Sequence, residues 1–270
     1  MKNHPEIFVP KEKELYYFNE FLPQKPDIKN INFKKSKNWY HKKFSFSDET
    51  KVRGELTPIY LSSDSAPSEI FKYNPKIKLI VVLRDPVLRA HSQFLFNRQK
   101  GFELEKDFLQ VLEKKKEIYV KESLYYEGIS RYLNYFQKDQ FLILDYQNLF
   151  ENPKANLNEI CRFLNVRFIP HRGINEVINK GRDAKFQFIN QVIGQFNILT
   201  KRPAMKQIRE LANILKINVL AKSIINTNTQ DRRGTGLNSL SYSTALEYFI
   251  KDIEKLEIFL NKDLSEWKKN

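Results

Sequence analysis

One segment in the first half of the chain carries the clearest pattern of hydrophobic and polar positions. A largely apolar, β-branched run at 77–83 ends abruptly in an Arg-Asp-Pro sequence at 84–86, which predicts a buried strand followed by a tight turn. Leu88, Phe94 and Leu95 then recur at helical spacing, which predicts a helix with one buried stripe. The order strand, turn, helix is typical of an α/β fold.

The same alternation of strand and helix patterns continues along the chain. Apolar positions predict helices over 107–116, 125–136, 156–165 and 246–260, and a short β-rich run predicts a strand over 141–144. Alternating strands and helices favour a mostly parallel sheet that is covered on both faces. No internal repeat or convincing linker divides the sequence. The pattern therefore predicts one α/β domain over residues 1–270.

Composition changes this picture chiefly through charge. The 270 residues include 46 basic and 32 acidic side chains, which gives a formal net charge of +14. An excess of this kind favours a polyanionic partner: nucleic acid, an anionic membrane, a sulfated glycan or a phosphorylated cofactor. Charge alone does not choose among these four classes.

Cysteine and histidine usage excludes two kinds of site. Cys161 is the single cysteine, so an intramolecular disulfide and a multi-cysteine metal site are both excluded, and its apolar helical setting predicts a buried structural thiol. The four histidines (His4, His41, His91 and His171) lack metal-ligand spacing, and nothing in the sequence requires a metal. No signal peptide or long apolar span is found, so we expect a soluble cytoplasmic protein with no transmembrane segment.

Arg84 and Ser92 flank the predicted turn between the strand and the helix. The carboxyl edge of a parallel sheet, followed by a helix N-terminus, commonly binds an anion. A guanidinium at the strand end and a hydroxyl about one turn into the helix can converge with helix amides on one phosphate. The alternative is an arginine paired with Asp85 or another acid, and this segment alone favours that alternative.

The segment also resembles a known motif. Arg84-Asp85-Pro86 and Arg89-Ala90-His91-Ser92 are similar to the 3′-phosphate-binding motif of sulfotransferases that use 3′-phosphoadenosine 5′-phosphosulfate (PAPS), in the form found in heparan sulfate sulfotransferases and their bacterial relatives. Six further family motifs have counterparts in family order: "HPxI…KExxFF" at 4–18, "GEKSPxY" at 54–60, "YxxxLxxWLxxF" at 125–136, "QxLVLxYEDL" at 140–149, "FLGV" at 163–166 and "LxxxLGxDLSxW" at 256–267. Each match alone is weak, whereas seven matches in the right order are strong.

This resemblance implies a fold, a reaction and a set of site residues. The fold is a P-loop-NTPase-like central parallel sheet flanked by helices, and the reaction is transfer of a sulfuryl group from PAPS to a hydroxyl of a carbohydrate or similar glycoconjugate. Arg84 and Ser92 match the residues that hold the 3′-phosphate. Glu14 matches the catalytic base of the family's "ExHFF" motif. The basic loop Lys180-Gly181-Arg182 is a candidate for binding the nucleotide or the acceptor.

One element of the family has no counterpart among these residues. The family begins with a strand, a Lys-Gly-Thr-Thr-like loop that wraps the 5′-phosphosulfate, and a helix, a unit of roughly 30 residues. The sequence matches the family from His4 onward, and none of its eight glycines forms such a loop. We therefore expect a fold that is N-terminally truncated by one strand–loop–helix, with unpaired backbone groups, an open apolar slot in the sheet and impaired transfer. Leu56 stands where many glycan-modifying relatives have lysine, which argues against a heavily sulfated acceptor.

Two other functions fit the sequence. The first is a non-catalytic nucleotide- or glycan-binding remnant of the same fold, in which Glu14 is a solvated charge in the run 11–14 and the basic loop is a solvated turn. The second is a basic nucleic-acid-binding protein, whose affinity falls steeply with salt without preference for a 3′-phosphorylated nucleotide. A nucleotide kinase fits less well, because no complete GxxxxGKS or GxxxxGKT loop exists. We adopt the transferase interpretation, which involves no specific nucleic acid.

Overall fold

The computed structural model describes residues 4–22, 25–33, 35–45, 51–170 and 237–269, with shorter stretches at 182–184, 189–190, 192–193, 210, 221, 223 and 229–231. The chain divides into two compact units. The first is built from Met1–Pro86, Val120–Glu176 and Tyr248–Lys269, and the second from Val87–Tyr119 and Val177–Glu247. The assignment of a single domain stays a prediction.

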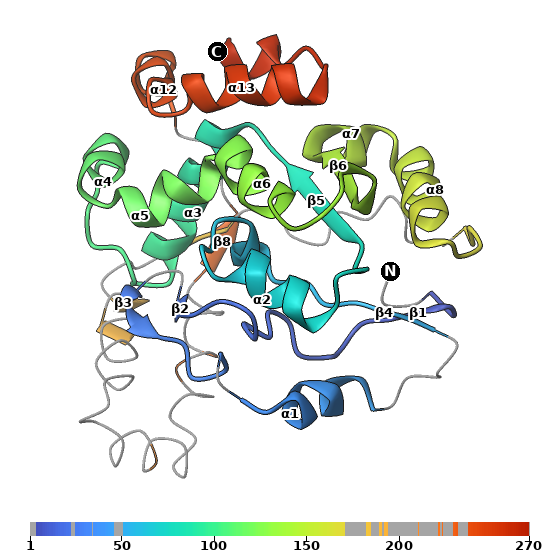
Figure 1. Ribbon diagram of the computed structural model, residues 1–270. Coiled ribbons are helices and arrows are strands. Elements are labelled where there is room, and N and C mark those ends of the chain that lie inside the picture. The colour runs from blue at the N-terminus through green and yellow to red at the C-terminus, as the bar shows by residue number, and fades with distance from the viewer. Residues whose placement is uncertain are drawn as a thin grey trace. The chain divides into compact units, whose positions relative to one another are not determined.

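Among the described residues, the first unit contains three pairs of strands and most of the helices (Figure 1). Its strands are β1 (Ile7–Phe8), β2 (Phe21–Leu22), β3 (Lys25–Lys29), β4 (Val52–Arg53), β5 (Leu79–Leu83) and β6 (Phe141–Asp145). Its helices are α1 (Lys37–His41), α2 (Ala66–Tyr73), α6 (Tyr125–Leu133), α7 (Tyr146–Glu151), α8 (Pro153–Leu164) and α13 (Ile250–Leu260). Its 3₁₀ turns are η1 (Lys42–Phe44), η2 (Pro58–Leu61), η3 (Lys121–Ser123), η4 (Lys138–Gln140) and η6 (Ser265–Lys268). β1 pairs in parallel with β4, whereas β2 and β3 are antiparallel.

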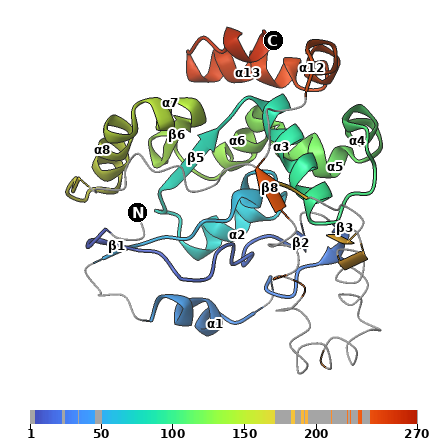
Figure 2. The same cartoon turned by 180° about the vertical axis from the view of Figure 1, so that it is seen from behind.

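β5 and β6 form the parallel ladder that the sequence predicts. Their pairing runs over the full length of both strands, from Leu79 opposite Phe141 to Leu83 opposite Asp145. Figure 2 shows the two strands side by side, with α7 and α8 following β6. Both strands are almost entirely apolar, as expected of a parallel strand whose two faces are both covered.

Helices cover the two faces of this ladder, as the alternation of patterns predicts. On one face, Leu79 and Phe141 pack against a cluster that includes residues of α2 and α6. On the other face, Leu142 and Leu144 pack with Ile160 of α8. Successive side chains of a strand point to opposite faces, so one run of apolar residues serves both cores. These contacts confirm a parallel α/β arrangement at β5 and β6.

α8 shows why the predicted helix at 156–165 forms. Pro153 stands at its first position, where a missing N–H costs nothing. Asn165 ends the helix in the left-handed region, with φ of 62°, a conformation that asparagine tolerates. Cys161 is buried on the inner side of the helix, as predicted for a structural thiol.

The second unit contains α3 (Pro86–Gln99, from Val87 on), α4 (Phe108–Lys114), α5 (Lys116–Tyr119), α12 (Ser239–Leu246) and the antiparallel pair β7 (Arg182–Ala184) and β8 (Thr229–Asp231). Phe94 of α3 packs near the rings of Phe108 and Tyr119. The buried stripe of α3 runs through Val87, Ala90 and Phe94, whereas Leu88 and Leu95 of the predicted stripe are only half-buried.

Two predicted helices are interrupted in the structure. The helix predicted over 107–116 is α4, which Asp107 caps by accepting the Leu109 amide at 2.8 Å, and it stops at Lys115, where φ of −131° leaves the helical region. The helix predicted over 246–260 is wrong at its start, because α13 begins only at Ile250. Among the described residues, no helix has the length and apolar character needed to cross a membrane.

Candidate functional site

Arg84 lies at the carboxyl edge of the β5–β6 ladder. Leu83 pairs with Asp145, so the residues that follow them, Arg84 and Tyr146, leave the ladder next to each other. The guanidinium carbon of Arg84 is 5.0 Å from the centre of the Tyr146 ring, a cation–π contact. Among the described residues, no carboxylate forms an ion pair with Arg84, so the expected alternative, pairing with Asp85 or another acid, is not observed.

The turn after β5 is as short as the sequence predicts. Only Arg84 and Asp85 separate the end of β5 from the start of α3 at Pro86. Ser92 lies in the second turn of α3 and is half-buried. Arg84 belongs to the first unit and Ser92 to the second, so the position of each residue is described within its own unit.

Tyr146 is a candidate functional residue that the sequence analysis missed. It begins α7 directly after β6, and 38% of its surface is exposed although it is a large aromatic residue. Phe150, one helical turn later, is also exposed, and the two ring centres are 4.9 Å apart. An exposed ring beside an arginine offers a flat surface for a planar ligand group. The only signal in the sequence is its position immediately after a predicted strand.

Glu14 lies in an exposed turn with an unusual backbone. Glu14 and Tyr16 both have positive φ values, 55° and 51°, in a region that residues other than glycine rarely adopt. The Tyr16 hydroxyl donates a hydrogen bond to the Glu14 carboxylate. Backbone conformations of this kind often occur at functional sites, where the surrounding structure holds them in place. The structure therefore presents Glu14 toward solvent on a strained turn.

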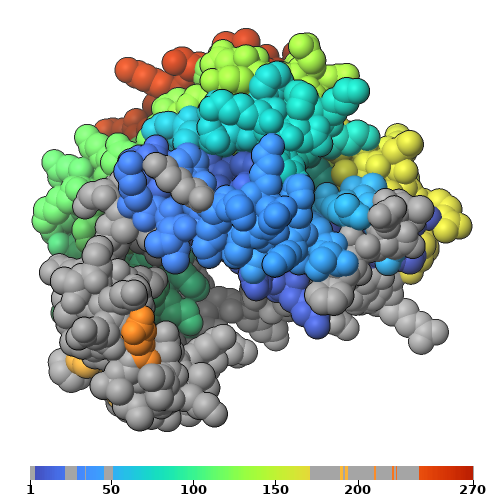
Figure 3. All heavy atoms as spheres, turned by 60° about the horizontal axis from the view of Figure 1, so that its bottom comes forward, coloured from blue at the N-terminus to red at the C-terminus, as the bar shows by residue number. Residues whose placement is uncertain are grey.

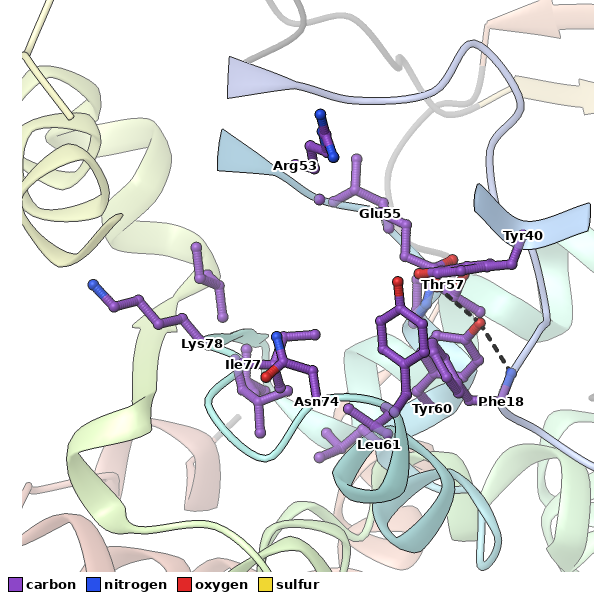
Figure 4. A pocket seen from close by; sticks show the side chains of 18 of the residues that line it. Phe18, Tyr40, Arg53, Glu55, Thr57, Tyr60, Leu61, Asn74, Ile77 and Lys78 are labelled. Carbon is purple, nitrogen blue, oxygen red and sulfur yellow. Dashed lines mark hydrogen bonds between the residues drawn. The ribbon is translucent and has the colours of Figure 1, made fainter. Parts of the chain in front are cut away.

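A large cavity lies in the first unit, next to β5 (Figure 4). Its volume is about 880 Å³. It is lined on one side by 77–82 and on another by 53–57, with the rings of Tyr40 and Tyr60 also in its wall. Within the described part of the chain β5 pairs only with β6, and β4 pairs only with β1. We call this cavity the β5 slot.

The β5 slot exposes part of β5, whereas the truncation of the sheet expected from the sequence stays a prediction. Val82 of β5 lines it and is 45% exposed, although the strand is otherwise apolar and half-buried or buried. An exposed valine on an unpaired edge is unusual in a parallel sheet, whose strands are normally covered on both sides. Within the described part of the chain, this edge of β5 has no partner strand that would cover the valine.

The remaining sequence-predicted residues are only partly placed. Lys180 and Gly181 lie outside the described residues. Arg182 begins β7 and pairs with Asp231 of β8 within the second unit, and its side chain is not described. In the part of the chain that the structure describes, no three His, Cys, Asp or Glu side chains gather into a metal-binding group.

The surface of the first unit shows how its N-terminal segment is held. Figure 3 shows blue residues of the N-terminal part of the chain lying against the cyan residues that follow them in the sequence. Below that surface, Leu15 and Phe18 pack with Ala66 and Ile70 of α2. The turn that carries Glu14 is therefore anchored on a packed core.

Comparisons with known proteins give a matching family model, curated relatives and a similar solved structure. The family model described as the sulfotransferase domain matches residues 23–188, a range that includes Arg84 and Ser92 but not Glu14. The chain is 29% identical over 175 residues to heparan sulfate glucosamine 3-O-sulfotransferase 5 of Mus musculus, which covers 60% of this chain and 47% of that protein. It is 26% identical over 180 residues to heparan sulfate glucosamine 3-O-sulfotransferase 3B1 of Homo sapiens, over 56% of this chain and 43% of that one.

The chain thus spans about half the length of the curated relatives it matches. Among solved structures, it is similar to a sulfotransferase from Alicyclobacillus acidocaldarius, with a TM-score of 0.65 and 19% identity, over 99% of this chain and 91% of that one. At this level of identity, the likeness shows a shared fold.

The open edge of β5 predicts a distinct pattern of amide hydrogen exchange. Along a parallel strand, alternate N–H groups point to opposite neighbours. We expect the amides of β5 that face β6 to be protected, and the alternate amides that face the slot to exchange faster by about 10-fold or more. NMR-detected exchange at residues 79–83 measures this. Equal protection at all five positions would show that the slot edge is already covered.

Proposed function

Because the chain belongs to the sulfotransferase domain family, we propose that it transfers a sulfuryl group from PAPS to a hydroxyl group of a carbohydrate or similar glycoconjugate. The observation that carries this proposal is Arg84 at the carboxyl edge of the β5–β6 ladder, in contact with the exposed Tyr146 ring and followed directly by a helix. This arrangement suits a nucleotide, because the arginine can bind a phosphate of the ribose and the exposed ring can stack on the base.

The donor site follows from the chemistry of these groups. The Arg84 guanidinium can donate two charge-assisted hydrogen bonds to the 3′-phosphate, and the Ser92 hydroxyl can donate a third. Tyr146 offers a surface on which the purine can stack, next to the phosphate. The basic loop Lys180-Gly181-Arg182 is a further candidate for contacts to the nucleotide or the acceptor. No metal takes part in this proposal.

The transfer itself is an in-line displacement at sulfur. The acceptor oxygen forms the new S–O bond while the bond from sulfur to the 5′-phosphate breaks, and adenosine 3′,5′-bisphosphate leaves with the electron pair. The acceptor hydroxyl loses its proton in the process, and Glu14 is the proposed base that takes it. As in phosphoryl transfer, positioning and charge stabilisation supply most of the catalysis.

The acceptor is proposed from two observations. The curated relatives that the chain resembles are named as heparan sulfate glucosamine 3-O-sulfotransferases, which favours a carbohydrate hydroxyl. Leu56, where many such relatives carry lysine, is 57% exposed beside the Glu14 turn, whose Glu14 amide donates to the Leu56 carbonyl at 3.1 Å. An exposed apolar residue at this position favours a sugar with few sulfate groups.

Binding of the nucleotide is tested first with Arg84→Ala. We expect this variant to lose hydrogen bonds to a charged group, worth about 1.5–3 kcal/mol, and therefore to bind adenosine 3′,5′-bisphosphate about 10- to 150-fold more weakly. Ser92→Ala should lose less. Titration calorimetry measures both, and Arg162→Ala, at an exposed arginine of α8, is the matched control.

The same titrations separate the rival functions. Adenosine 5′-monophosphate lacks the 3′-phosphate, so it should bind weakly to the wild type. Its affinity for Arg84→Ala should be the same as its affinity for the wild type. Unchanged bisphosphate affinity in Arg84→Ala would overturn the assignment. Equal affinity for both nucleotides with a steep dependence on salt would instead support a nucleic-acid-binding protein.

The base is tested with Glu14→Gln. We expect the rate of transfer to fall about 10²- to 10⁴-fold, because the acceptor keeps its proton, while the affinity for adenosine 3′,5′-bisphosphate stays unchanged. Single-turnover transfer from radiolabelled PAPS to a neutral oligosaccharide measures slow rates reliably. Glu12→Gln, at an exposed acid in the same charged run, is the control. Wild-type transfer by Glu14→Gln would show that another group is the base.

For residues 1–270 by themselves we propose slow transfer. The support is the lack of a Lys-Gly-Thr-Thr-like loop in the sequence, together with the β5 slot. Fusing a strand, such a loop and a helix ahead of residue 1 should raise the single-turnover rate, because the loop lysine would stabilise charge on the leaving phosphate. Rapid transfer by residues 1–270 that the fusion leaves unchanged would contradict this. Bisphosphate binding without any transfer by the fusion would favour a non-catalytic remnant.

A further inference from the structure

Glu55 carries a carboxyl group that is surrounded by hydroxyl donors. Its Oε1 accepts from the Tyr40 hydroxyl at 2.8 Å and from the Tyr60 hydroxyl at 3.2 Å, and its Oε2 accepts from the Thr57 hydroxyl at 3.0 Å. The four residues line the wall of the β5 slot (Figure 4). Burial raises the pKa of Glu55, and burial beside its charge also raises the pKa values of Tyr40 and Tyr60. Both phenols therefore stay protonated and remain donors.

Three hydroxyl donors limit what the Glu55 carboxyl can do as a proton acceptor. A carboxylate has about four lone-pair positions, and the hydroxyls of Tyr40, Thr57 and Tyr60 occupy three of them. A general base needs a position that is open to the substrate proton. The contacts of Glu55 therefore point to a role that is exerted through the groups that it holds.

One of those groups, the Tyr60 hydroxyl, contacts the turn that carries Glu14. The Tyr60 hydroxyl, while donating to Glu55, accepts from the amides of Tyr17 at 2.8 Å and Phe18 at 3.4 Å. The Glu14 amide donates to the carbonyl of Leu56 at 3.1 Å. Three backbone amides of the turn thus donate to the segment 54–60.

The turn requires such ties because its backbone is strained. Glu14 and Tyr16 have positive φ values, and neither is glycine. A chain segment relaxes from such a conformation unless its surroundings fix it. Glu14 is itself exposed, so its own side chain supplies no packing that would fix it. The side chains of Asn30 and Asn32 donate to the carbonyls of Tyr16 and Leu15, and the Glu55–Tyr60 network holds the amides of Tyr17 and Phe18.

We propose that Glu55 is a positioning residue: through Tyr60 it holds the strained turn so that the Glu14 carboxylate faces the acceptor. The proposal rests on the role of Glu14 proposed above. It assigns to the "GEKSPxY"-like segment a task in transfer that does not involve contact with the substrate.

Amide exchange in Glu55→Gln tests whether Glu55 holds the turn. Glutamine keeps the size of the side chain but replaces one acceptor oxygen with a donor, which then meets the donating hydroxyl of Thr57 or those of Tyr40 and Tyr60. We expect the amides of Tyr17 and Phe18 to exchange about 10-fold faster or more, while β6 amides keep their protection. Unchanged exchange at these two amides would overturn the proposal.

A double-mutant cycle tests whether Glu55 acts through Glu14. We expect Glu55→Gln to slow single-turnover transfer about 100-fold, with the affinity for adenosine 3′,5′-bisphosphate unchanged. The double variant Glu14→Gln/Glu55→Gln should transfer about as slowly as Glu14→Gln alone, because a misplaced turn costs nothing once the base is gone. Losses that multiply in the double variant would show that Glu55 acts independently, against the proposal.

The exchange and transfer measurements distinguish failure of the Glu14 proposal from failure of the Glu55 proposal. If Glu14→Gln alone transfers normally, the base assignment fails, and the exchange measurement still decides whether Glu55 holds the turn. If Glu55→Gln does not fold, Tyr60→Phe replaces it, since it removes only the hydroxyl between Glu55 and the amides of Tyr17 and Phe18. Faster exchange at those two amides with unchanged bisphosphate affinity then supports the proposal, and unchanged exchange overturns it.

Discussion

The register between β5 and β6 is the constraint on which the candidate site depends. Because Leu83 lies opposite Asp145, Arg84 and Tyr146 emerge together from the ladder and come into contact. A slip of one residue in either strand would move its apolar side chains to the wrong face. The packing of Leu142 and Leu144 against α8 opposes such a slip. Core packing on one side of the sheet therefore fixes a polar contact at its edge.

A second constraint joins the core to the turn that carries Glu14. Phe18, Tyr40 and Tyr60 bury their rings in one cluster, and a buried phenol needs a hydrogen-bond partner for its hydroxyl. Glu55 supplies that partner for Tyr40 and Tyr60, and the Tyr60 hydroxyl also accepts from the Tyr17 amide of the turn. The residues that stabilise this cluster are thus the residues that shape the backbone at Glu14. Substitutions in this cluster should therefore change the backbone conformation at Glu14.

Sequence patterns predicted the local features and missed those that depend on distant residues. The strand at 79–83, the two-residue turn and the strand at 141–145 follow from runs of apolar residues and from Arg-Asp-Pro, so they could be predicted. Arg84 and Tyr146 are 62 positions apart in the sequence, and their contact depends on the pairing of β5 with β6. The hydroxyl network of Glu55 likewise joins segments that no local pattern relates. The end of α4 at Lys115 occurs within an otherwise helical pattern and had no signal in it.

The central claim is that the carboxyl edge of the β5–β6 ladder holds the 3′-phosphate of the nucleotide. A crystal structure of the chain with adenosine 3′,5′-bisphosphate tests it most directly. The account predicts the 3′-phosphate at a hydrogen-bond distance of about 2.7–2.9 Å from the Arg84 guanidinium, with the purine against the Tyr146 ring. A bisphosphate bound elsewhere, with Arg84 still resting on Tyr146 and no phosphate within reach, would contradict it.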